Sequence, residues 1–141
     1  PLESIVRLVR GMIPHIYLVF FVEALEYLER EGRIGKAQAL LGAMLNIKPI
    51  LIVEDGEIVA LEKVRTRPRA VDKLFEFVAE FSQIEEMAIL QVGSEVETEE
   101  LIQRLQQIFP NRQFPVLPYG PVLATLIGPG AMGIIVYEGM Y

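Results

Sequence analysis

The sequence of 141 residues contains no cysteine and no tryptophan, and it has a single histidine, His15. Without cysteine there is no disulfide, no zinc–thiolate site and no cysteine nucleophile, which fits a reducing compartment such as the cytoplasm. One histidine leaves no paired-histidine metal site and little scope for a serine–histidine mechanism. Only three serines are present, and none lies in a nucleophile elbow. We therefore expect a protein that is not an enzyme and that holds neither a metal nor a cofactor.

Positive charge is also scarce, because 13 lysine and arginine residues face 19 acidic residues and the formal net charge is −6. Such an overall charge repels nucleic acid, so no nucleic-acid partner is expected. Hydrophobic residues make up 52% of the chain, which is enough for a core and excludes intrinsic disorder. The length predicts a single domain over residues 1–141.

Long uninterrupted apolar runs are missing as well. Residues 113–137 carry no charge, but four prolines and four glycines break the stretch, so it cannot form a lipid-exposed helix. Residues 12–22 are uncharged but reach only about half of the ~20 residues that a spanning helix needs. No transmembrane segment is expected. Because the chain begins with Pro1 rather than methionine, we also expect it to be processed or excised from something longer.

Apolar periodicity predicts strands and helices that alternate along the chain. Asp55-Gly56 between two β-type runs is a strong signal for a tight antiparallel hairpin. We therefore predict an α+β fold, in which helices pack on a mixed or antiparallel sheet of about five strands. The expected strands are 15–22, 48–54, 57–66, 87–92 and 132–137; the expected helices are 3–10, 23–31, 36–47, 68–83 and one from a Thr98 cap to Phe109, with a short helix or loop at 120–127.

The predicted helix 36–47 is unusually apolar. Its polar or small positions form one thin stripe, made by Gln38, Gly42 and Asn46. A surface helix normally has a wider polar face. This segment must therefore be buried, or it must cover something apolar that is not part of this chain.

Two glycine-rich segments are candidate ligand contacts. Gly128-Pro129-Gly130-Ala131-Met132-Gly133 matches GxGxxG literally, but a strand follows it where a dinucleotide site needs a helix. It is either a tight turn or a place where the backbone approaches a ligand, since a missing Cβ permits that contact. Arg33 lies between two glycines; it is either a solvated loop residue or a bidentate partner for a carboxylate or phosphate.

Basic residues alternate along the end of the predicted hairpin. Lys63, Arg65 and Arg67 alternate on its predicted second strand, so all three would share one face. In an acidic chain this strip either docks an acidic partner or phosphorylated ligand, or is a solvated strand face.

Together these segments resemble the C-terminal half of the DegV family of bacterial fatty-acid-binding proteins. The resemblance lies in three ordered blocks, which are 25–51 with its Gly32-Arg33-Ile34-Gly35-Lys36 core, 55–67 with Asp55-Gly56 and Lys63-Val64-Arg65-Thr66-Arg67, and 120–133 with Gly120-Pro121 and Gly128-Pro129-Gly130-Ala131. It implies the C-terminal lobe of a two-lobe protein whose N-terminal lobe is absent here. Such proteins hold a long-chain fatty acid between their lobes.

The resemblance also implies a role. In many bacteria these proteins are the acyl-carrying subunit of fatty acid kinase, and a separate kinase subunit phosphorylates the bound carboxylate for phospholipid synthesis. The implied head-group residues are Arg33, Thr125, Leu126, Gly128 and Gly130; the implied acyl-chain residues are Ile34, Leu40, Leu41, Met44 and Leu45; the implied kinase-docking residues are Arg33, Lys36, Arg65 and Arg67.

One departure from the family pattern concerns the head group. Leu126 stands where the family usually has a histidine, so either the ligand differs or Thr125 compensates. The alternative function is an interaction module that forms a homodimer through its exposed apolar surface and binds no lipid on its own. The lipid hypothesis depends on residues 36–47 having more apolar surface than their own fold can cover.

Overall fold

A six-stranded sheet organises the chain, with the strand order β3-β2-β1-β6-β4-β5. The computed structural model describes residues 1–32, 34–35 and 47–139. All neighbouring strands are antiparallel except β4 and β5, which are parallel. The elements are α1 Leu2–Met12, a 3₁₀ turn η1 Ile13–His15, β1 Ile16–Phe21, α2 Glu26–Arg30, β2 Lys48–Glu54, β3 Glu57–Val64, α3 Arg67–Ala79, β4 Ile84–Gln91, α4 Glu95–Ile108, β5 Val116–Leu117, α5 Pro121–Ile127 and β6 Met132–Glu138.

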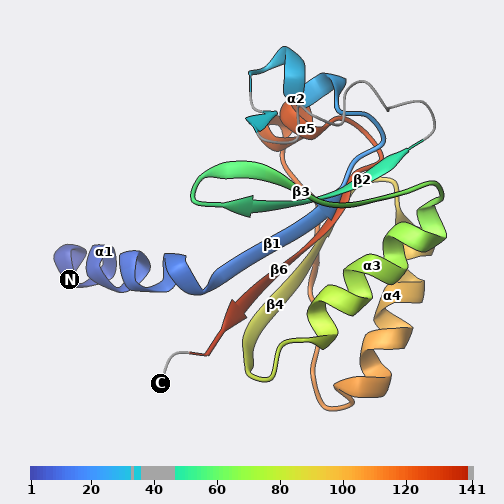
Figure 1. Cartoon of the computed structure of the whole chain (residues 1–141). Helices are drawn as coiled ribbons and strands as arrows, with labels where there is room; N and C mark the ends of the chain where they lie inside the picture. Colours follow the sequence, from blue (N-terminus) through green and yellow to red (C-terminus); the bar gives the residue numbers. More distant parts are fainter. Residues whose placement is uncertain (33, 36–46, 140–141) are drawn as a thin grey trace.

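Helices cover the two faces of this sheet differently. The pair α3 and α4 runs along one face, whereas α2 and α5 lie together on the other (Figure 1). Strand β1, in the middle of the sheet, contributes side chains to both faces, because successive side chains of a strand point to opposite sides. Val19 and Phe21 pack toward α3, and Leu18 and Phe20 point to the α5 side. The predicted α+β class is confirmed, with one strand more than expected, the two-residue β5.

The hairpin between β2 and β3 forms where the sequence predicts it. Asp55 has φ 52° and Gly56 has φ 77°, as a two-residue turn that matches the twist of the strands requires. Strand β3 ends at Val64, earlier than predicted, because Thr66 caps α3: the backbone N–H of Arg69 donates to its Oγ1 at 3.3 Å. Arg65 and Arg67 are therefore not on the strand, and the prediction that they share a strand face with Lys63 is wrong.

The start of α4 also differs from the prediction. The helix begins at Glu95 after Ser94, not after a Thr98 cap. Gly93, at φ 78°, turns the chain directly after β4, so the helix starts one turn earlier. Thr98 is buried inside the helix, and its hydroxyl donates to the Ser94 carbonyl at 2.7 Å.

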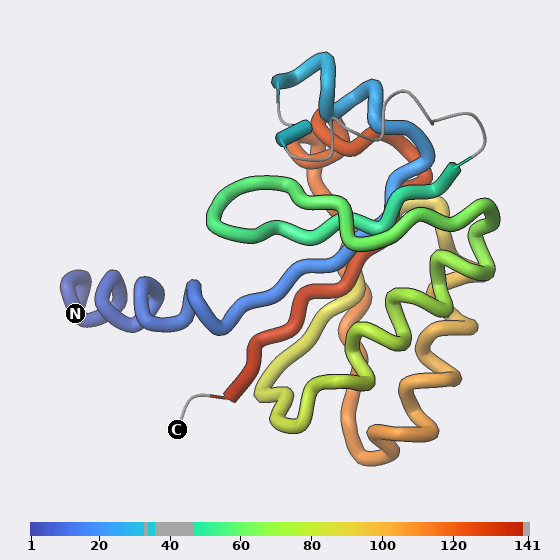
Figure 2. Tube along the Cα trace, viewed as in Figure 1, coloured from blue at the N-terminus to red at the C-terminus, as the bar shows by residue number. Residues whose placement is uncertain are grey.

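Helix α1 leads away from the sheet, as the trace in Figure 2 shows, and none of its residues is buried. In the part of the chain that the structure describes, no helix combines the length and hydropathy of a membrane span. The predicted helix over 36–47 lies almost entirely outside the described residues.

Candidate ligand-binding site

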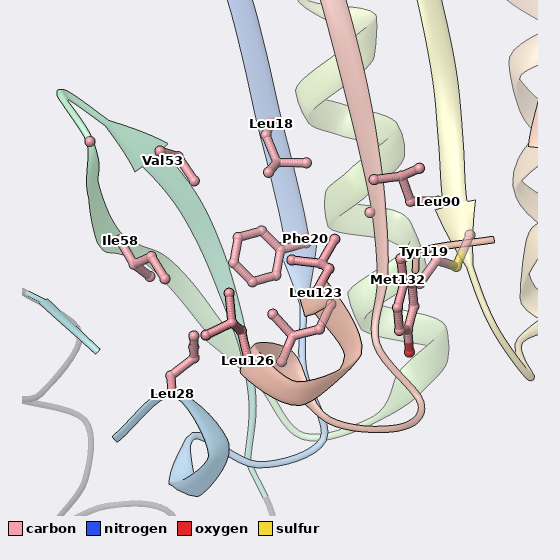
Figure 3. Close-up of a pocket in the computed structure, with 13 residues that line it drawn as sticks. Leu18, Phe20, Leu28, Val53, Ile58, Leu90, Tyr119, Leu123, Leu126 and Met132 are labelled. Atoms are coloured by element: carbon pink, nitrogen blue, oxygen red, sulfur yellow. The ribbon is translucent and has the colours of Figure 1, made fainter. Parts of the chain in front are cut away.

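A cavity of about 230 Å³ lies on the α5 side of the sheet. Its walls come from β1, the β2–β3 hairpin, the end of β4, α5 and the start of β6, and most of its side chains are aliphatic or aromatic (Figure 3). The lining residues are Leu18, Phe20, Leu28, Val53, Gly56, Ile58, Leu90, Tyr119, Leu123, Leu126, Ile127, Met132 and Gly133. Such a surface suits an apolar group of a ligand rather than a charged one.

The floor of the cavity depends on a glycine. Phe20 on β1 lies directly opposite Gly133 on β6. A Cβ at position 133 would lie 2.8 Å from the Phe20 Cβ and 2.9 Å from the Val19 carbonyl oxygen. Glycine at this position therefore lets the Phe20 side chain stand between the sheet and α5, where it lines the cavity.

Tyr119 brings a polar atom to this apolar wall. The side chain is buried, and its hydroxyl donates to the carbonyl of Gly128 at 3.2 Å. Burial raises the pKa of the Tyr119 hydroxyl, and a hydrogen bond with the Ala131 backbone offsets only part of this. The hydroxyl therefore stays protonated at neutral pH, and the cavity wall carries no charge here.

The turn 128–131 connects α5 to β6 at the end of the cavity. Gly128 and Gly130 both have φ 77°, a conformation that favours glycine. A Cβ at Gly128 would also lie 2.5 Å from the Tyr27 ring, and one at Gly130 would lie 2.8 Å from the Glu23 Cγ. The two glycines are thus required by the turn itself and by close packing against Tyr27 and Glu23.

Arg67 lies on the outer side of this turn. Its Nη1 donates to the Gly130 carbonyl at 2.9 Å, and its Nη2 donates to the Ser94 Oγ at 2.9 Å. Its Nε pairs with Glu97 at 2.7 Å, and Nη1 also pairs with Glu23. The guanidinium is thus occupied by partners within the chain.

The two carboxylates respond to this arginine. Burial disfavours the charged form of Glu23, but hydrogen bonds from Lys48 and Arg67 outweigh it and hold the pKa of Glu23 below its usual value. The same balance of burial against Arg67 lowers the pKa of Glu97. Both side chains are therefore ionised at neutral pH, and the cluster is a set of paired charges.

The predicted head-group residues are partly brought together. Leu126 lines the cavity, whereas Thr125 on the same helix is exposed and its hydroxyl donates to the Pro121 carbonyl at 2.9 Å. Gly128 and Gly130 follow in the adjoining turn. Arg33 lies outside the described residues.

The predicted acyl-chain and docking residues are only partly described. Ile34 is buried in the same apolar cluster as Leu28 and Phe20. Arg65 is exposed, and the structure gives it no ion pair within the described residues. The residues outside that part of the chain are Lys36, Leu40, Leu41, Met44 and Leu45.

Most residues of the cavity wall were not predicted from the sequence. The wall residues from β1, the hairpin and β6 are ordinary apolar strand residues, with no motif of their own. A signal existed in residues 15–22, where both faces of the predicted strand are apolar, so a ligand or a second layer must cover each face. Among the described residues, no group of three or more His, Asp or Glu side chains could hold a metal ion.

The sequence matches a known protein family. The family profile described as "Uncharacterised protein, DegV family" matches residues 1–139. Protein DegV of Bacillus subtilis is 33% identical over 135 residues, covering 94% of this chain and 48% of that protein. This chain thus spans about half the length of the curated relatives it matches.

Solved structures agree with this match. The crystal structure of a fatty acid binding DegV family protein from Streptococcus agalactiae superposes with a TM-score of 0.86 at 29% identity, over 99% of this chain and 50% of that one. The Fatty Acid Kinase (Fak) B3 protein of Streptococcus pneumoniae, loaded with linoleic acid, has a TM-score of 0.84 at 19% identity over 99% of this chain and 50% of its own, which shows a shared fold. The chain belongs to the DegV family.

Proposed function

We propose that this chain is a lobe of a fatty-acid-binding protein and that the cavity beneath α5 holds part of the acyl tail. The single observation that carries the proposal is the apolar cavity of about 230 Å³, whose one buried polar side chain in the described lining, Tyr119, is hydrogen-bonded to the backbone. The relative from Streptococcus agalactiae is itself named as fatty acid binding. Each methylene transferred from water to such a wall contributes about 0.8 kcal/mol.

The size of the cavity supports a site shared with a second lobe. Pockets for small ligands usually enclose roughly 300–1,000 Å³. The cavity here is smaller, at about 230 Å³, and several of its wall residues are only half-buried. A long acyl chain would therefore need further apolar cover, which the predicted acyl-chain residues Ile34, Leu40, Leu41, Met44 and Leu45 and an N-terminal lobe would supply.

The head group belongs to the same proposal. The carboxylate would lie at the end of the cavity near α5 and the turn 128–131, with Arg33 as its charged partner. A separate kinase subunit would then phosphorylate it, docking on Arg33, Lys36 and Arg65 in the cytoplasm. Arg65 supports this because it is an exposed cation in a chain of net charge −6. The engaged guanidinium of Arg67 does not support a docking role for that residue.

Lipid extraction tests the proposal directly. The complete natural protein that carries this chain and the chain itself are purified, extracted and analysed by mass spectrometry. We expect acyl chains in the complete protein, and their loss in Leu123→Glu, because a charge in the apolar wall opposes tail binding. Val122→Glu on the same helix is the matched control, since Val122 is 80% exposed.

Two outcomes would overturn the proposal. Absence of acyl chains from the complete wild-type protein, even after incubation with fatty acid, would exclude the binding function. Equal lipid content in Leu123→Glu and Val122→Glu would place the ligand elsewhere. Acyl chains in the complete protein but not in the isolated chain would show that this lobe does not bind alone.

One observation favours the second candidate, an interaction module that dimerises. Helix α1 exposes a row of apolar side chains, with Leu2 74%, Ile5 58% and Leu8 59% exposed. A contiguous apolar surface of this kind is typical of a protein contact. Light scattering of the purified chain separates the candidates: a dimer that extracts no lipid would favour the interaction module.

A further inference from the structure

We propose that Arg67 is a positioning residue for the ligand site: it holds the turn 128–131 in place, and through that turn it fixes the wall of the cavity next to the ligand's carboxylate. This inference rests on the proposed fatty-acid binding and deepens it. It also assigns Arg67 a role different from docking a partner.

Arg67 joins four segments that are far apart in the chain. It begins α3, and its guanidinium contacts Glu23 after β1, Ser94 before α4, and Gly130 in the turn before β6. Glu97 on α4 completes the set at 2.7 Å from Nε. A planar guanidinium presents its donors in a fixed fork, so these partners also fix its orientation. The carbonyl of Gly130 is therefore held by a group that cannot easily turn.

The charge of Arg67 is balanced within this cluster. Glu23 and Glu97 accept from it, and Lys48 pairs with Glu23 at 2.8 Å, so two cations meet two carboxylates. The guanidinium also lies over the Phe21 ring, with its central carbon 5.0 Å from the ring centroid. A guanidinium with these neighbours is poorly placed to bind a free anion or an acidic partner. Its remaining effect is on the backbone that it contacts.

One peptide plane carries that effect into the cavity. In a planar trans peptide the C=O and the following N–H point in opposite directions. The Gly130 carbonyl accepts from Arg67 on the outer side, and the N–H of Ala131 belongs to the same peptide plane. Tyr119 in turn donates to the Gly128 carbonyl at 3.2 Å and lines the cavity.

The turn is thus clamped from two sides. Arg67 holds Gly130 from the outside and Tyr119 holds Gly128 from the cavity side. Both glycines have φ 77°, in a region where the backbone has little side-chain restraint of its own. Without Arg67 the Gly130–Ala131 peptide could rotate, and Tyr119 at Gly128 would be the remaining side-chain anchor of the turn among these contacts. The end of the site that receives the carboxylate would then be disordered, while the apolar floor at Phe20 and Gly133 would remain.

Two ligands with the same tail separate these effects. Binding of palmitic acid and of methyl palmitate is measured on the complete natural protein and on Arg67→Gln, Arg67→Lys and Arg69→Gln. Arg69 is the matched control because it lies on the same helix, is exposed, and its guanidinium pairs only with Asp72 among the described residues. We expect Arg67→Gln to weaken palmitic acid binding by about tenfold, the size expected when the hydrogen bond from a charged group, here from Arg67 to the Gly130 carbonyl, is lost. Methyl palmitate binding should change by less than about twofold, and Arg67→Lys should fall between.

Amide hydrogen exchange provides a readout independent of the ligand. The Ala131 amide should exchange faster in Arg67→Gln than in the wild type, and Arg69→Gln should leave it unchanged. Equal losses for both ligands would overturn the inference, because they would indicate a general loss of structure. Unchanged palmitic acid binding or unchanged Ala131 exchange in Arg67→Gln would also overturn it. Failure of the wild type to bind either ligand would instead refute the proposed function.

Discussion

The two faces of the sheet are built from similar residues but have different surroundings. On the α3 and α4 side, Leu74, Leu101 and Leu105 are completely buried. On the α5 side, Leu18, Leu123 and Leu126 are only half-buried and surround a cavity. Strand β1 contributes to both. Packing of the first face thus stabilises the fold, whereas the second face leaves apolar surface around a cavity, where we propose that the ligand binds.

Truncation on the two faces should show the largest contrast. Leu74→Ala should lower the free energy of unfolding by about 2–5 kcal/mol, because it leaves a cavity in a packed core. Leu123→Ala should cost less than about 1 kcal/mol, since its side chain already borders empty space. Urea unfolding followed by circular dichroism measures both. Equal losses would mean that the two faces are packed alike.

Restoring the family residue at the head group sharpens the role of the open face. Leu126→His in the complete natural protein should raise fatty-acid affinity by about tenfold, because a histidine N–H near the carboxylate adds a charge-assisted hydrogen bond. Fluorescence competition with a labelled fatty acid measures the affinity. An unchanged affinity would show that leucine at this position is harmless and that Thr125 or the backbone compensates.

Reversing an exposed charge tests the proposed docking surface between β3 and α3. Arg65→Glu should weaken association with the proposed kinase subunit severalfold, mainly through a slower association rate, while the lipid content stays the same. Surface plasmon resonance gives the rates, and Arg69→Glu on the first turn of α3 is the control. Unchanged association with Arg65→Glu would refute its docking role.

The smallest expected effect is on the pH dependence of stability, and it comes from the ion pairs of Arg67 with Glu23 and Glu97. Burial opposes ionisation of both carboxyls, yet their hydrogen bonds with Arg67 and, for Glu23, Lys48 hold each pKa below the usual 4.5. A lowered pKa stabilises the folded state above pH 4.5, and that contribution is lost as the pH falls further through the folded pKa. Thermal unfolding between pH 7 and pH 3 should therefore show a loss that is smaller in Arg67→Met. Identical pH profiles would contradict the pairing.

The sequence predicted those elements whose signals are local. Asp55-Gly56 specified the hairpin because few residues accept positive φ at both positions. Strand β5 was missed as a strand because its two residues are defined only by pairing with Ile89 and Leu90, a contact made by the tertiary fold. Ser94 and Thr98 are both residue types that cap helices well. The helix starts after Ser94 because Gly93, with its positive φ, turns the chain just before it.

The site was predicted less well, for a physical reason. Alternation along residues 15–22 shows which side chains share a face, but it cannot show which face has a helix over it and which has a cavity. Arg67 looked like a strand residue by spacing, although Thr66 before it and Pro68 after it indicate the start of a helix. The Gly128-Pro129-Gly130 motif indicated the turn 128–131, and the resemblance added its proposed role at the head group; the turn follows α5, which lines the cavity.

The balanced cluster around Arg67 has a consequence for the salt dependence of the protein. Two cations and two carboxylates within contact distance produce a field that largely cancels at a distance. Added salt screens charges farther apart than about 8 Å at physiological ionic strength, so it should leave this cluster and its turn intact. Arg65 has no such counter-charge among the described residues, and encounters that depend on it should slow as the salt concentration rises. Ionic strength would thus separate the proposed ligand binding from the proposed docking of a kinase subunit.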